Sequence, residues 1–170
     1  MTARTPSEKT DGAPQRAVGT RWVTRERPKI DRIACPWLSL RFIDRDAEFL
    51  YVPPAEVLKV AQATGATPYD IPGVEMSHVG ERCSFDAFLA RYALTDPALQ
   101  QLATIVRGAD TSRLDLTPQS PGLYALSLGL SHLFADDHEM LRHALVMYDA
   151  LYAWCCGCRD ETHHWPPKMD

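Results

Sequence analysis

One thiol and several cations lie within a short early segment of the chain, at residues 27–37. In this segment Pro36 directly follows Cys35. Because proline suits the first position of a helix, we expect Cys35 to be the residue just before a helix, its N-cap. The positive end of the helix dipole and the nearby Arg32 would both favour the thiolate there. The sequence therefore predicts Cys35 as a candidate catalytic residue, with a small buried thiol as the alternative.

The same segment could bind an oxyanion, because free backbone N–H groups at the start of a helix point at an anion. On a helix Arg41 shares a face with Ala34 and Trp37, so its guanidinium is directed toward the apolar side and needs an anionic partner. That partner could be a ligand or a carboxylate of the last helix, Asp137 or Asp149. The predicted ligand-binding residues are Arg27, Lys29, Asp31, Arg32 and Arg41.

Potential metal ligands lie in the loop-like run of residues 73–83. Imidazole, carboxylate and thiol groups all bind transition metals, and loops on a rigid scaffold often carry ligands. Asp137 lies near the apolar stripe of the last helix and could complete the set. The alternative is that His78 caps a turn while Cys83 packs under the following helix. The predicted metal ligands are Glu75, His78, Cys83 and Asp137, and the cofactor, whose identity the sequence does not fix, would be a divalent transition metal.

Other residues that could do chemistry form weaker patterns. His138 and His143 are five residues apart, whereas a metalloprotease helix needs histidines four apart. Arg107 and Asp110 follow the expected end of a helix at Val106 and are interpreted as surface ion pairs. The end of the chain supplies soft ligands without regular zinc-finger spacing, namely Cys155, Cys156, Cys158, His163 and His164.

The elements that must position these residues form an α+β fold that is mainly helical, with a small early β-sheet, expected to be mixed, and a helical second half. Alternating apolar residues predict strands, and apolar residues at helical spacing predict helices. The expected strands are 21–25, 49–52 and 69–71. The expected helices are 30–43 with a break, 54–64 closed by Gly65, 84–92 with Ser84 as N-cap, 96–106, 122–134 and 136–155.

The chain of 170 residues fits one domain, and its composition, 45% hydrophobic and 24% charged, is typical of globular proteins. Residues 1–20 are rich in polar residues, proline and glycine, so we expect a disordered leader. The expected domain covers residues 21–157. Residues 158–170 are expected to be a flexible tail.

The net charge of −4 argues against direct nucleic-acid binding, which normally needs a basic face. The sequence contains neither an apolar run of the roughly 18 to 20 residues that cross a bilayer nor a secretory signal, so we expect a cytoplasmic protein without a membrane partner. Five cysteines without a disulfide pattern predict reduced thiols. An oligomer is compatible with the sequence.

Several segments together form a long and specific pattern. The longest is Pro-Lys-Ile-Asp-Arg-Ile-Ala-Cys-Pro-Trp-Leu at residues 28–38, preceded by Trp-Val-Thr-Arg at residues 22–25. The others are 41–44, 49–53, 70–78, 83–85, 105–110 and 136–137. This pattern resembles the C-terminal domain of the ChrB chromate-resistance family. One departure is Arg107, which stands where the family pattern Val-His-Asp-x-Asp has a histidine, so that potential metal ligand is absent.

The resemblance implies an association with chromate resistance and stress response. Full-length family members resemble regulators with a separate N-terminal DNA-binding part, and nothing of that part precedes Arg21, so direct transcriptional regulation is not expected here. We expect a domain that binds or senses an oxyanion or a metal ion, with redox chemistry as an open question. The alternatives are a metal-dependent enzyme of unknown substrate and a partner-binding regulatory domain without catalysis.

Overall fold

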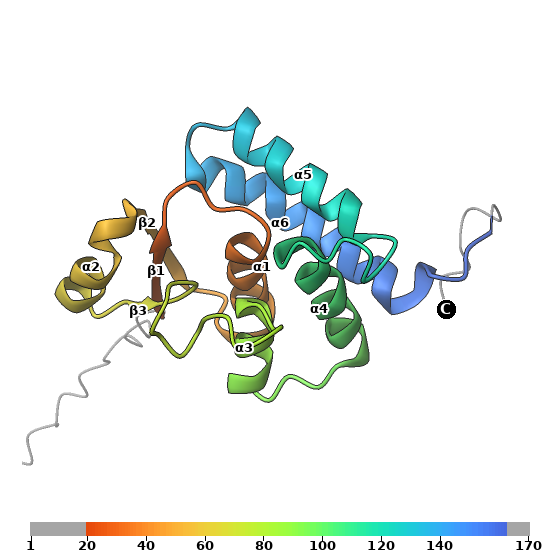
Figure 1. Cartoon of the computed structure of the whole chain (residues 1–170), viewed down its shortest axis with the longest axis horizontal. Coiled ribbons are helices and arrows are strands. Elements are labelled where there is room, and N and C mark those ends of the chain that lie inside the picture. The colour runs from red at the N-terminus through yellow and green to blue at the C-terminus, as the bar shows by residue number, and fades with distance from the viewer. Residues whose placement is uncertain (1–19, 163–170) are drawn as a thin grey trace, which may run out of the picture.

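The computed structural model describes residues 20–162. The predicted leader, apart from Thr20, and residues 163–170 of the predicted tail lie outside the described residues. Within the described part, one small β-sheet forms early and helices make up most of the rest (Figure 1). The predicted α+β class with dominant helices is confirmed.

Three parallel strands form the sheet in the order β2-β1-β3. Strand β1 spans Arg21–Arg25, β2 spans Glu48–Val52 and β3 spans Thr67–Pro68. A helical segment lies between each strand and the next along the chain, and parallel pairing requires such crossovers. The expectation of a mixed sheet is therefore wrong.

The third strand is shorter than expected and ends before residue 69. Tyr69 still donates its N–H to the carbonyl of Val23 on β1 at 3.1 Å, but its own bridge is an isolated one with Met76. Asp70 has a left-handed backbone conformation, with φ 51°, and Pro72 follows two residues later, so the chain leaves the sheet here. The predicted strand 69–71 is wrong. Because β3 ends at Pro68, Asp70 lies just beyond the C-terminal end of this strand.

Within residues 20–162, six α-helices follow the expected order, with small shifts at their ends. Most agree with the predicted ranges, whereas the fourth extends beyond Val106. They are α1 Asp31–Leu38, α2 Val57–Thr64, α3 Ser84–Arg91, α4 Pro97–Asp110, α5 Ser120–Leu133 and α6 Asp137–Ala153. A short 3₁₀-helix at Pro54–Glu56 precedes α2, and π-helices at Ser39–Ile43 and Trp154–Cys158 extend α1 and α6.

Helix α1 begins four residues before Cys35, so the expected N-cap position for this cysteine is wrong. Pro36 lies inside the helix, where its missing N–H leaves the carbonyl oxygen of Arg32 without its helical donor. The hydroxyl of Tyr69 donates to that oxygen at 3.2 Å and replaces the lost bond. The contact with Tyr69 thus makes Pro36 tolerable inside α1, although proline is usually found at the start of a helix.

Helix α3 begins after Cys83, which is its N-cap in place of the expected Ser84. The Cys83 N–H donates to Asp86 Oδ2 at 3.1 Å, which satisfies a backbone donor at the start of the helix. Ser84 is fully buried and directs its hydroxyl to Asp70 instead. Because Cys83 is the N-cap, the side chain of Ser84 can hold Asp70 in the loop after β3.

Two hydrophobic clusters lie on the two faces of the sheet. Trp22 on β1 belongs to the larger cluster, which α1, α3, α4 and α6 complete, while the next residue, Val23, belongs to a smaller cluster with Val57 of α2. This split follows from the alternation of side chains along a strand. Helix α1 lies centrally, between the sheet and the C-terminal helices (Figure 1).

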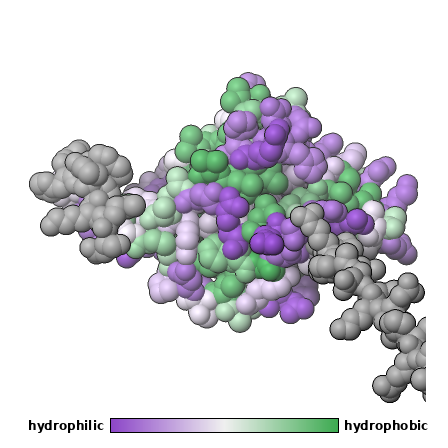
Figure 2. All heavy atoms as spheres, turned by 180° about the vertical axis from the view of Figure 1, so that it is seen from behind, coloured by the Kyte–Doolittle hydropathy of each residue, from purple (hydrophilic) through white to green (hydrophobic). Residues whose placement is uncertain are grey.

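Some apolar side chains remain at the surface of the described part. They include Leu126 and Leu133 of α5 and Val146 of α6. In the view from behind, apolar and polar side chains are interspersed (Figure 2). Among the described helices, none combines the length with the apolar character that a membrane span requires.

Candidate metal centre

Three carboxylates converge on one nitrogen atom of a histidine. His78 Nε2 lies 3.0 Å from Asp110 Oδ2, 3.2 Å from Asp31 Oδ2 and 3.3 Å from Asp70 Oδ1. The donors come from segments that are far apart in the sequence. These four residues, Asp31, Asp70, His78 and Asp110, are called the His78 site below.

The His78 site lies where strands of the parallel sheet end. Asp31 is the first residue of α1, which follows β1, and Asp70 lies two residues after β3. Asp110 is the last residue of α4, and His78 lies in the loop between β3 and α3. Parallel sheets flanked by helices usually bind ligands at the carboxyl ends of their strands. The fold therefore gathers these residues at a place that is typical of binding sites.

Two of the carboxylates are almost fully buried and held in place by hydrogen bonds. Asp31 is 1% exposed and Asp70 is 6% exposed. The Ser84 N–H donates to Asp31 Oδ2 at 3.1 Å, and the Ser84 hydroxyl donates to Asp70 Oδ1 at 2.9 Å. On the far oxygen of Asp70, Arg25 donates at 2.7 Å and Arg32 Nε lies at 3.3 Å. Asp70 thus has neutralising partners on one side and faces His78 on the other.

The hydrogen-bond capacity of His78 does not match its surroundings. Its Nε2 can carry only one hydrogen, yet three carboxylate oxygens lie within 3.3 Å of it. One N–H cannot donate well to three acceptors. A cation placed among the four groups would satisfy all of them at once, because every donor atom would then offer a lone pair to it.

The electrostatics of the site show the same imbalance. Burial, together with the charge of Asp31, raises the pKa of Asp110 to about 8 and also raises the pKa of Asp70. The hydrogen bond with Asp31, followed by the charges of the other carboxylates, raises the pKa of His78 to about 9. The site therefore retains protons that isolated groups of these types would lose at neutral pH.

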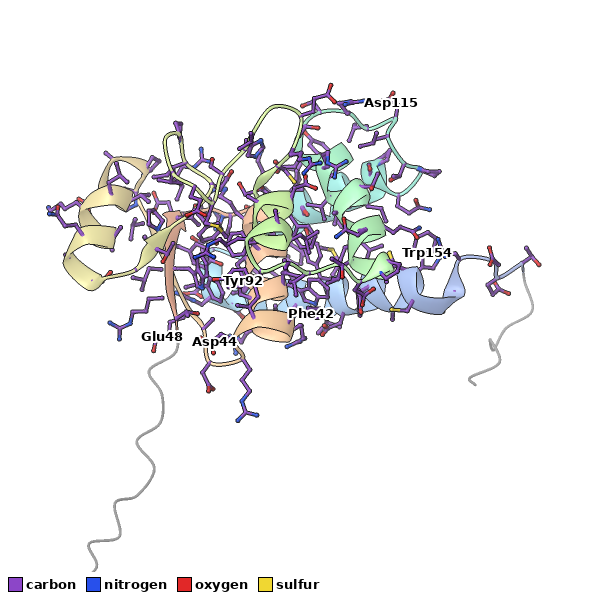
Figure 3. The ribbon with its side chains drawn as sticks, turned by 90° about the horizontal axis from the view of Figure 1, so that it is seen from below. Phe42, Asp44, Glu48, Tyr92, Asp115 and Trp154 are labelled. Carbon is purple, nitrogen blue, oxygen red and sulfur yellow. The ribbon has the colours of Figure 1, made fainter. Side chains whose placement is uncertain are left out.

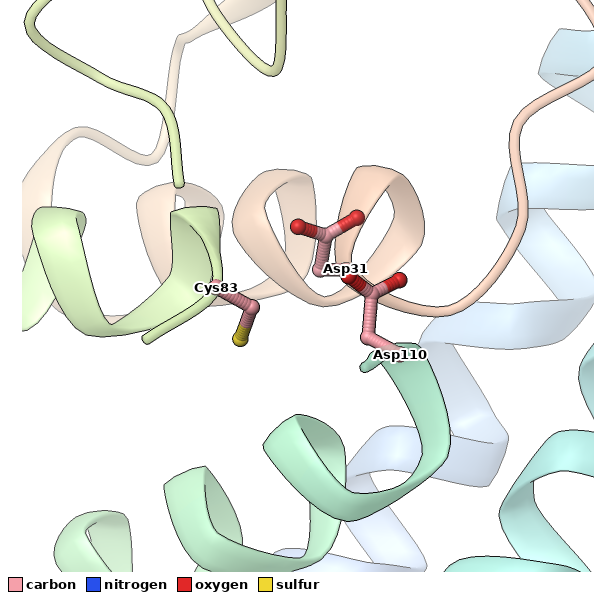
Figure 4. Close-up of side chains that lie close together, drawn as sticks. All are labelled: Asp31, Cys83 and Asp110. Carbon is pink, nitrogen blue, oxygen red and sulfur yellow. The ribbon is translucent and has the colours of Figure 1, made fainter. Parts of the chain in front are cut away.

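A thiol lies beside the carboxylates. The ligand atoms of Asp31, Cys83 and Asp110 lie within 4.8 Å of one another, and the same holds for those of Asp31, Asp70 and His78. Figure 4 shows Asp31 on α1, Cys83 at the start of α3 and Asp110 at the end of α4. Cys83 is fully buried, and burial raises the pKa of its thiol. Oxygen, nitrogen and sulfur donors are thus all available at this place.

Comparison with known proteins identifies the family. Residues 22–155 match the family described as ChrB, C-terminal domain, and this range contains the whole His78 site. The chain belongs to this family. Membership in the ChrB family associates the domain with chromate resistance.

A curated relative of the domain is Protein ChrB from Cupriavidus metallidurans. The two sequences are 31% identical over 141 residues, which cover 82% of this chain and 42% of the relative. The chain therefore spans less than half the length of that ChrB protein. The comparison with solved structures gives no match.

The ChrB-family domain brings together part of the predicted metal set. His78 and Cys83 both lie at the site, whereas Glu75 is exposed and pairs with Arg91 at 3.4 Å. Met76, the next residue, is buried and forms a bridge with Tyr69, whereas Glu75 is exposed.

The last predicted metal ligand, Asp137, lies with a different group of residues. It accepts the backbone N–H of Arg27 at 2.9 Å, and Arg27 Nη1 lies 3.6 Å from its other oxygen. The sequence therefore indicated two of the donors found at the site, His78 and Cys83, and the structure directs Glu75 and Asp137 to other partners.

Three of the four predicted anion-binding cations in the ChrB-family domain contact protein acceptors. The guanidinium of Arg27 donates to backbone carbonyls at the end of α5, and that of Arg32 donates to those of Arg25 and Glu26. Arg41 forms a two-point pair with Asp149 at 2.8 and 2.7 Å, which confirms one of the two carboxylate partners considered for it. The fourth cation, Lys29, is exposed, and Asp31, predicted with these cations, belongs to the His78 site.

The expected thiolate at Cys35 is wrong. This residue is fully buried inside α1, and burial, followed by the charge of Asp31, raises the pKa of its thiol. A mid-helix position also removes the favourable dipole that an N-cap would have supplied. Cys35 thus has the surroundings of a packed, protonated cysteine.

Asp70 and Asp110 are site residues that spacing and periodicity missed. The expected surface pairs of Arg107 and Asp110 are wrong, because α4 continues to Asp110 and Arg107 forms a two-point pair with buried Asp86 at 2.9 and 2.5 Å. A signal was nevertheless present in the sequence. Both aspartates lie in segments that resemble the ChrB family, 70–78 and 105–110.

Proposed function

We propose that this ChrB-family domain binds a divalent transition-metal ion at the His78 site. One observation carries the proposal: a single imidazole nitrogen lies 3.0–3.3 Å from carboxylate oxygens of three separate segments. A structural role alone would be served by one carboxylate and one imidazole. At the His78 site, Asp110 and His78 instead retain protons at neutral pH, and a divalent cation could displace these protons and bind the freed donor atoms.

The spacing of the donor atoms supports the proposal. Metal bonds to oxygen and nitrogen ligands are about 2.0 to 2.3 Å long, which places neighbouring ligand atoms about 3.0 to 3.4 Å apart. The three distances from His78 Nε2 lie within this range. The side chain of His78 is also 40% exposed, so an ion could reach the buried carboxylates from its side.

The donor types narrow the choice of metal. Carboxylates suit Mn²⁺, and imidazole suits Fe²⁺, Zn²⁺ and other later metals. A mixture of three carboxylates and one imidazole therefore favours a first-row divalent ion over Ca²⁺ or Mg²⁺. Mn²⁺, Co²⁺ and Zn²⁺ are suitable probes.

The association of the family with chromate resistance gives this metal site a biological setting. We propose that the domain contributes to resistance by binding or sensing an ion, and that any oxyanion binds with the help of the metal. Arg27, Arg32 and Arg41 were expected to bind an oxyanion, but their guanidinium groups already contact acceptors of the protein itself. A bound metal ion is therefore a better candidate for the group that contacts the oxyanion.

Metal uptake by chelator-treated protein tests the proposal. We expect about one Mn²⁺ or Co²⁺ per chain by calorimetric titration, together with a rise in thermal stability. Ligand at about 100 times its dissociation constant should add about 2.7 kcal/mol. His78→Gln and Asp110→Asn should each remove the uptake and the stabilisation.

Matched controls separate the site from general charge effects. Asp115→Asn removes an exposed carboxylate in the loop after α4 (Figure 3), and His132→Gln removes an exposed imidazole on α5. Both control variants should bind like the wild type. Wild-type protein that takes up none of the three probe metals, or uptake unchanged in His78→Gln and Asp110→Asn, would contradict the proposal.

A further inference from the structure

We infer that Cys83 is a fifth donor of the His78 site and selects a thiophilic ion such as Zn²⁺ or Co²⁺ over Mn²⁺. This inference rests on the proposed metal site and deepens it. Thiolates select Zn²⁺ and related ions, whereas carboxylates alone accept oxygen-preferring ions such as Mn²⁺. One sulfur atom among oxygen donors would therefore decide which metal is held.

The position of Cys83 meets the geometric requirement. Its Sγ lies within 4.8 Å of ligand atoms of both Asp31 and Asp110, which are the two carboxylates closest to His78 Nε2 (Figure 4). Metal–sulfur bonds of about 2.3 Å and metal–oxygen bonds of about 2.1 Å join sulfur and oxygen atoms up to about 4.4 Å apart, so side-chain shifts of a few tenths of an ångström suffice to bring the three donors to one ion. On coordination the S–H bond breaks, its proton passes to solvent and a sulfur lone pair forms the bond to the metal.

Two features near Cys83 partly offset the burial and the nearby carboxylates, which raise the pKa of its thiol. As the N-cap of α3, it lies at the positive end of an eight-residue helix. The nearest carboxylate outside the His78 site is Asp86, whose Oδ2 lies 3.6 Å from Sγ. Arg107 holds both oxygens of Asp86 in a two-point pair, so this carboxylate is neutralised and repels a thiolate less.

Arg107 thus has a role that follows from its place in the structure. Its guanidinium pairs with Asp86, and Asp86 in turn lies beside the Cys83 thiol. In this chain, position 107 would act on the metal through Asp86 and Cys83. We regard Arg107 as a positioning residue.

Absorption spectroscopy of the Co²⁺-loaded chain tests the inference. A background variant with Cys156→Ser and Cys158→Ser removes the more accessible thiols near the end of the chain. With Co²⁺ bound, this protein should show a sulfur-to-cobalt charge-transfer band in the near ultraviolet. Adding Cys83→Ser should abolish the band while Co²⁺ still binds. Because serine is a good N-cap, α3 should persist in this variant.

Relative affinities give a second readout. Cys83→Ser should weaken Zn²⁺ binding by about tenfold or more and change Mn²⁺ binding by less than about threefold. A matched control is Cys35→Ala, which removes another fully buried thiol and should leave the ratio of the two affinities unchanged.

The outcomes distinguish this inference from the proposed function. If Co²⁺ binds stoichiometrically without the charge-transfer band, or if Cys83→Ser keeps the band, Cys83 is not a ligand and the metal site stands. If no metal binds and His78→Gln behaves like the wild type, the proposed function itself fails.

Discussion

The donors of the His78 site differ in how firmly the fold holds them. Asp31 and Asp70 are buried and receive hydrogen bonds from Ser84, and Asp110 ends a helix of 14 residues. His78 lies in a loop and is 40% exposed. At the scale of residues, three donors are fixed in advance and one can move, which lowers the entropy that is lost on binding.

Without metal, the stability of the domain should fall as the pH rises from 6.5 to 9. His78, which faces Asp31, Asp70 and Asp110, has a pKa raised from 6.5 to about 9, so its stabilising charge is fully present below pH 6.5 and is lost as the pH passes 9. The raised pKa of Asp110, about 8, acts in the same direction, since the folded protein holds a proton that the unfolded chain releases.

Urea denaturation of chelator-treated protein at several pH values measures this dependence. His78→Gln should show a shallower decline than the wild type between pH 6.5 and 8, where cysteine ionisation contributes little. His132→Gln should match the wild type. A wild-type stability that is constant or increases over this range would refute the expectation.

Breaking the pair between Arg107 and Asp86 should destabilise the fold. Asp86 is buried and also accepts the Cys83 N–H at the start of α3, so Arg107→Ala would leave a buried charge without its partner. We expect a loss of about 2 to 3 kcal/mol in the free energy of unfolding. The control Arg113→Ala breaks an exposed pair with Glu81 and should cost less than about 1 kcal/mol. Equal effects of the two variants in urea denaturation would contradict this reading.

At the scale of elements, local rules predicted most helices and strands but not how they are joined. Gly65 ends α2 with φ 72°, as the sequence predicted, because the signal and its effect lie in the same turn. Pro36 misled the prediction, since the hydroxyl that compensates for it belongs to Tyr69, 33 positions further along the chain. Asp70 and Asp110 were missed for the same reason: their role depends on which elements meet.

Helices α4 and α5 meet so closely that one glycine is required. A Cβ at Gly108 would lie 2.3 Å from Ser120 Oγ and 3.0 Å from the carbonyl oxygen of Arg113. Ser120 cannot move freely, because its hydroxyl donates to the carbonyl of Ile105 at 3.0 Å. Gly108→Ala should therefore reduce the free energy of unfolding by about 1 to 3 kcal/mol despite the better helix propensity of alanine.

The matched substitution Gly129→Ala should have the opposite effect. Gly129 lies inside α5, and an added Cβ would meet nothing within 4 Å. We expect a gain of roughly 0.5 to 1 kcal/mol. Chemical denaturation of both variants checks the pair, and a Gly108→Ala variant as stable as the wild type would show that α4 and α5 can separate at little cost.

At the scale of the whole molecule, the sheet divides the fold into unequal parts. The larger hydrophobic cluster involves α1, α3, α4 and α6, whereas α2 packs through a few residues of the smaller cluster. The His78 site belongs to the larger part, at the junction of α1, the loop before α3, and α4. Metal binding would therefore act on elements that pack together in the larger cluster, and α2 would take no part.

Hydrogen exchange should reveal this division. Adding metal to chelator-treated protein should slow exchange in residues 69–83 and at the adjoining ends of α1 and α4, because these segments carry the donors. Exchange in α2, residues 57–64, should change little. Slower exchange in α2 but not in residues 69–83, measured by mass spectrometry, would place the metal elsewhere.

The single mobile donor has a consequence for the rate of ion exchange. Asp31, Asp70 and Asp110 can stay in place while the partly exposed side chain of His78 turns outward, so an ion could leave without any helix moving. The backbone next to His78 need not move either, because Met76 stays buried in the core. The residence time of the ion would then be set by the rotation of this side chain, and its equilibrium affinity largely by the carboxylates beneath, so each could be tuned with little effect on the other.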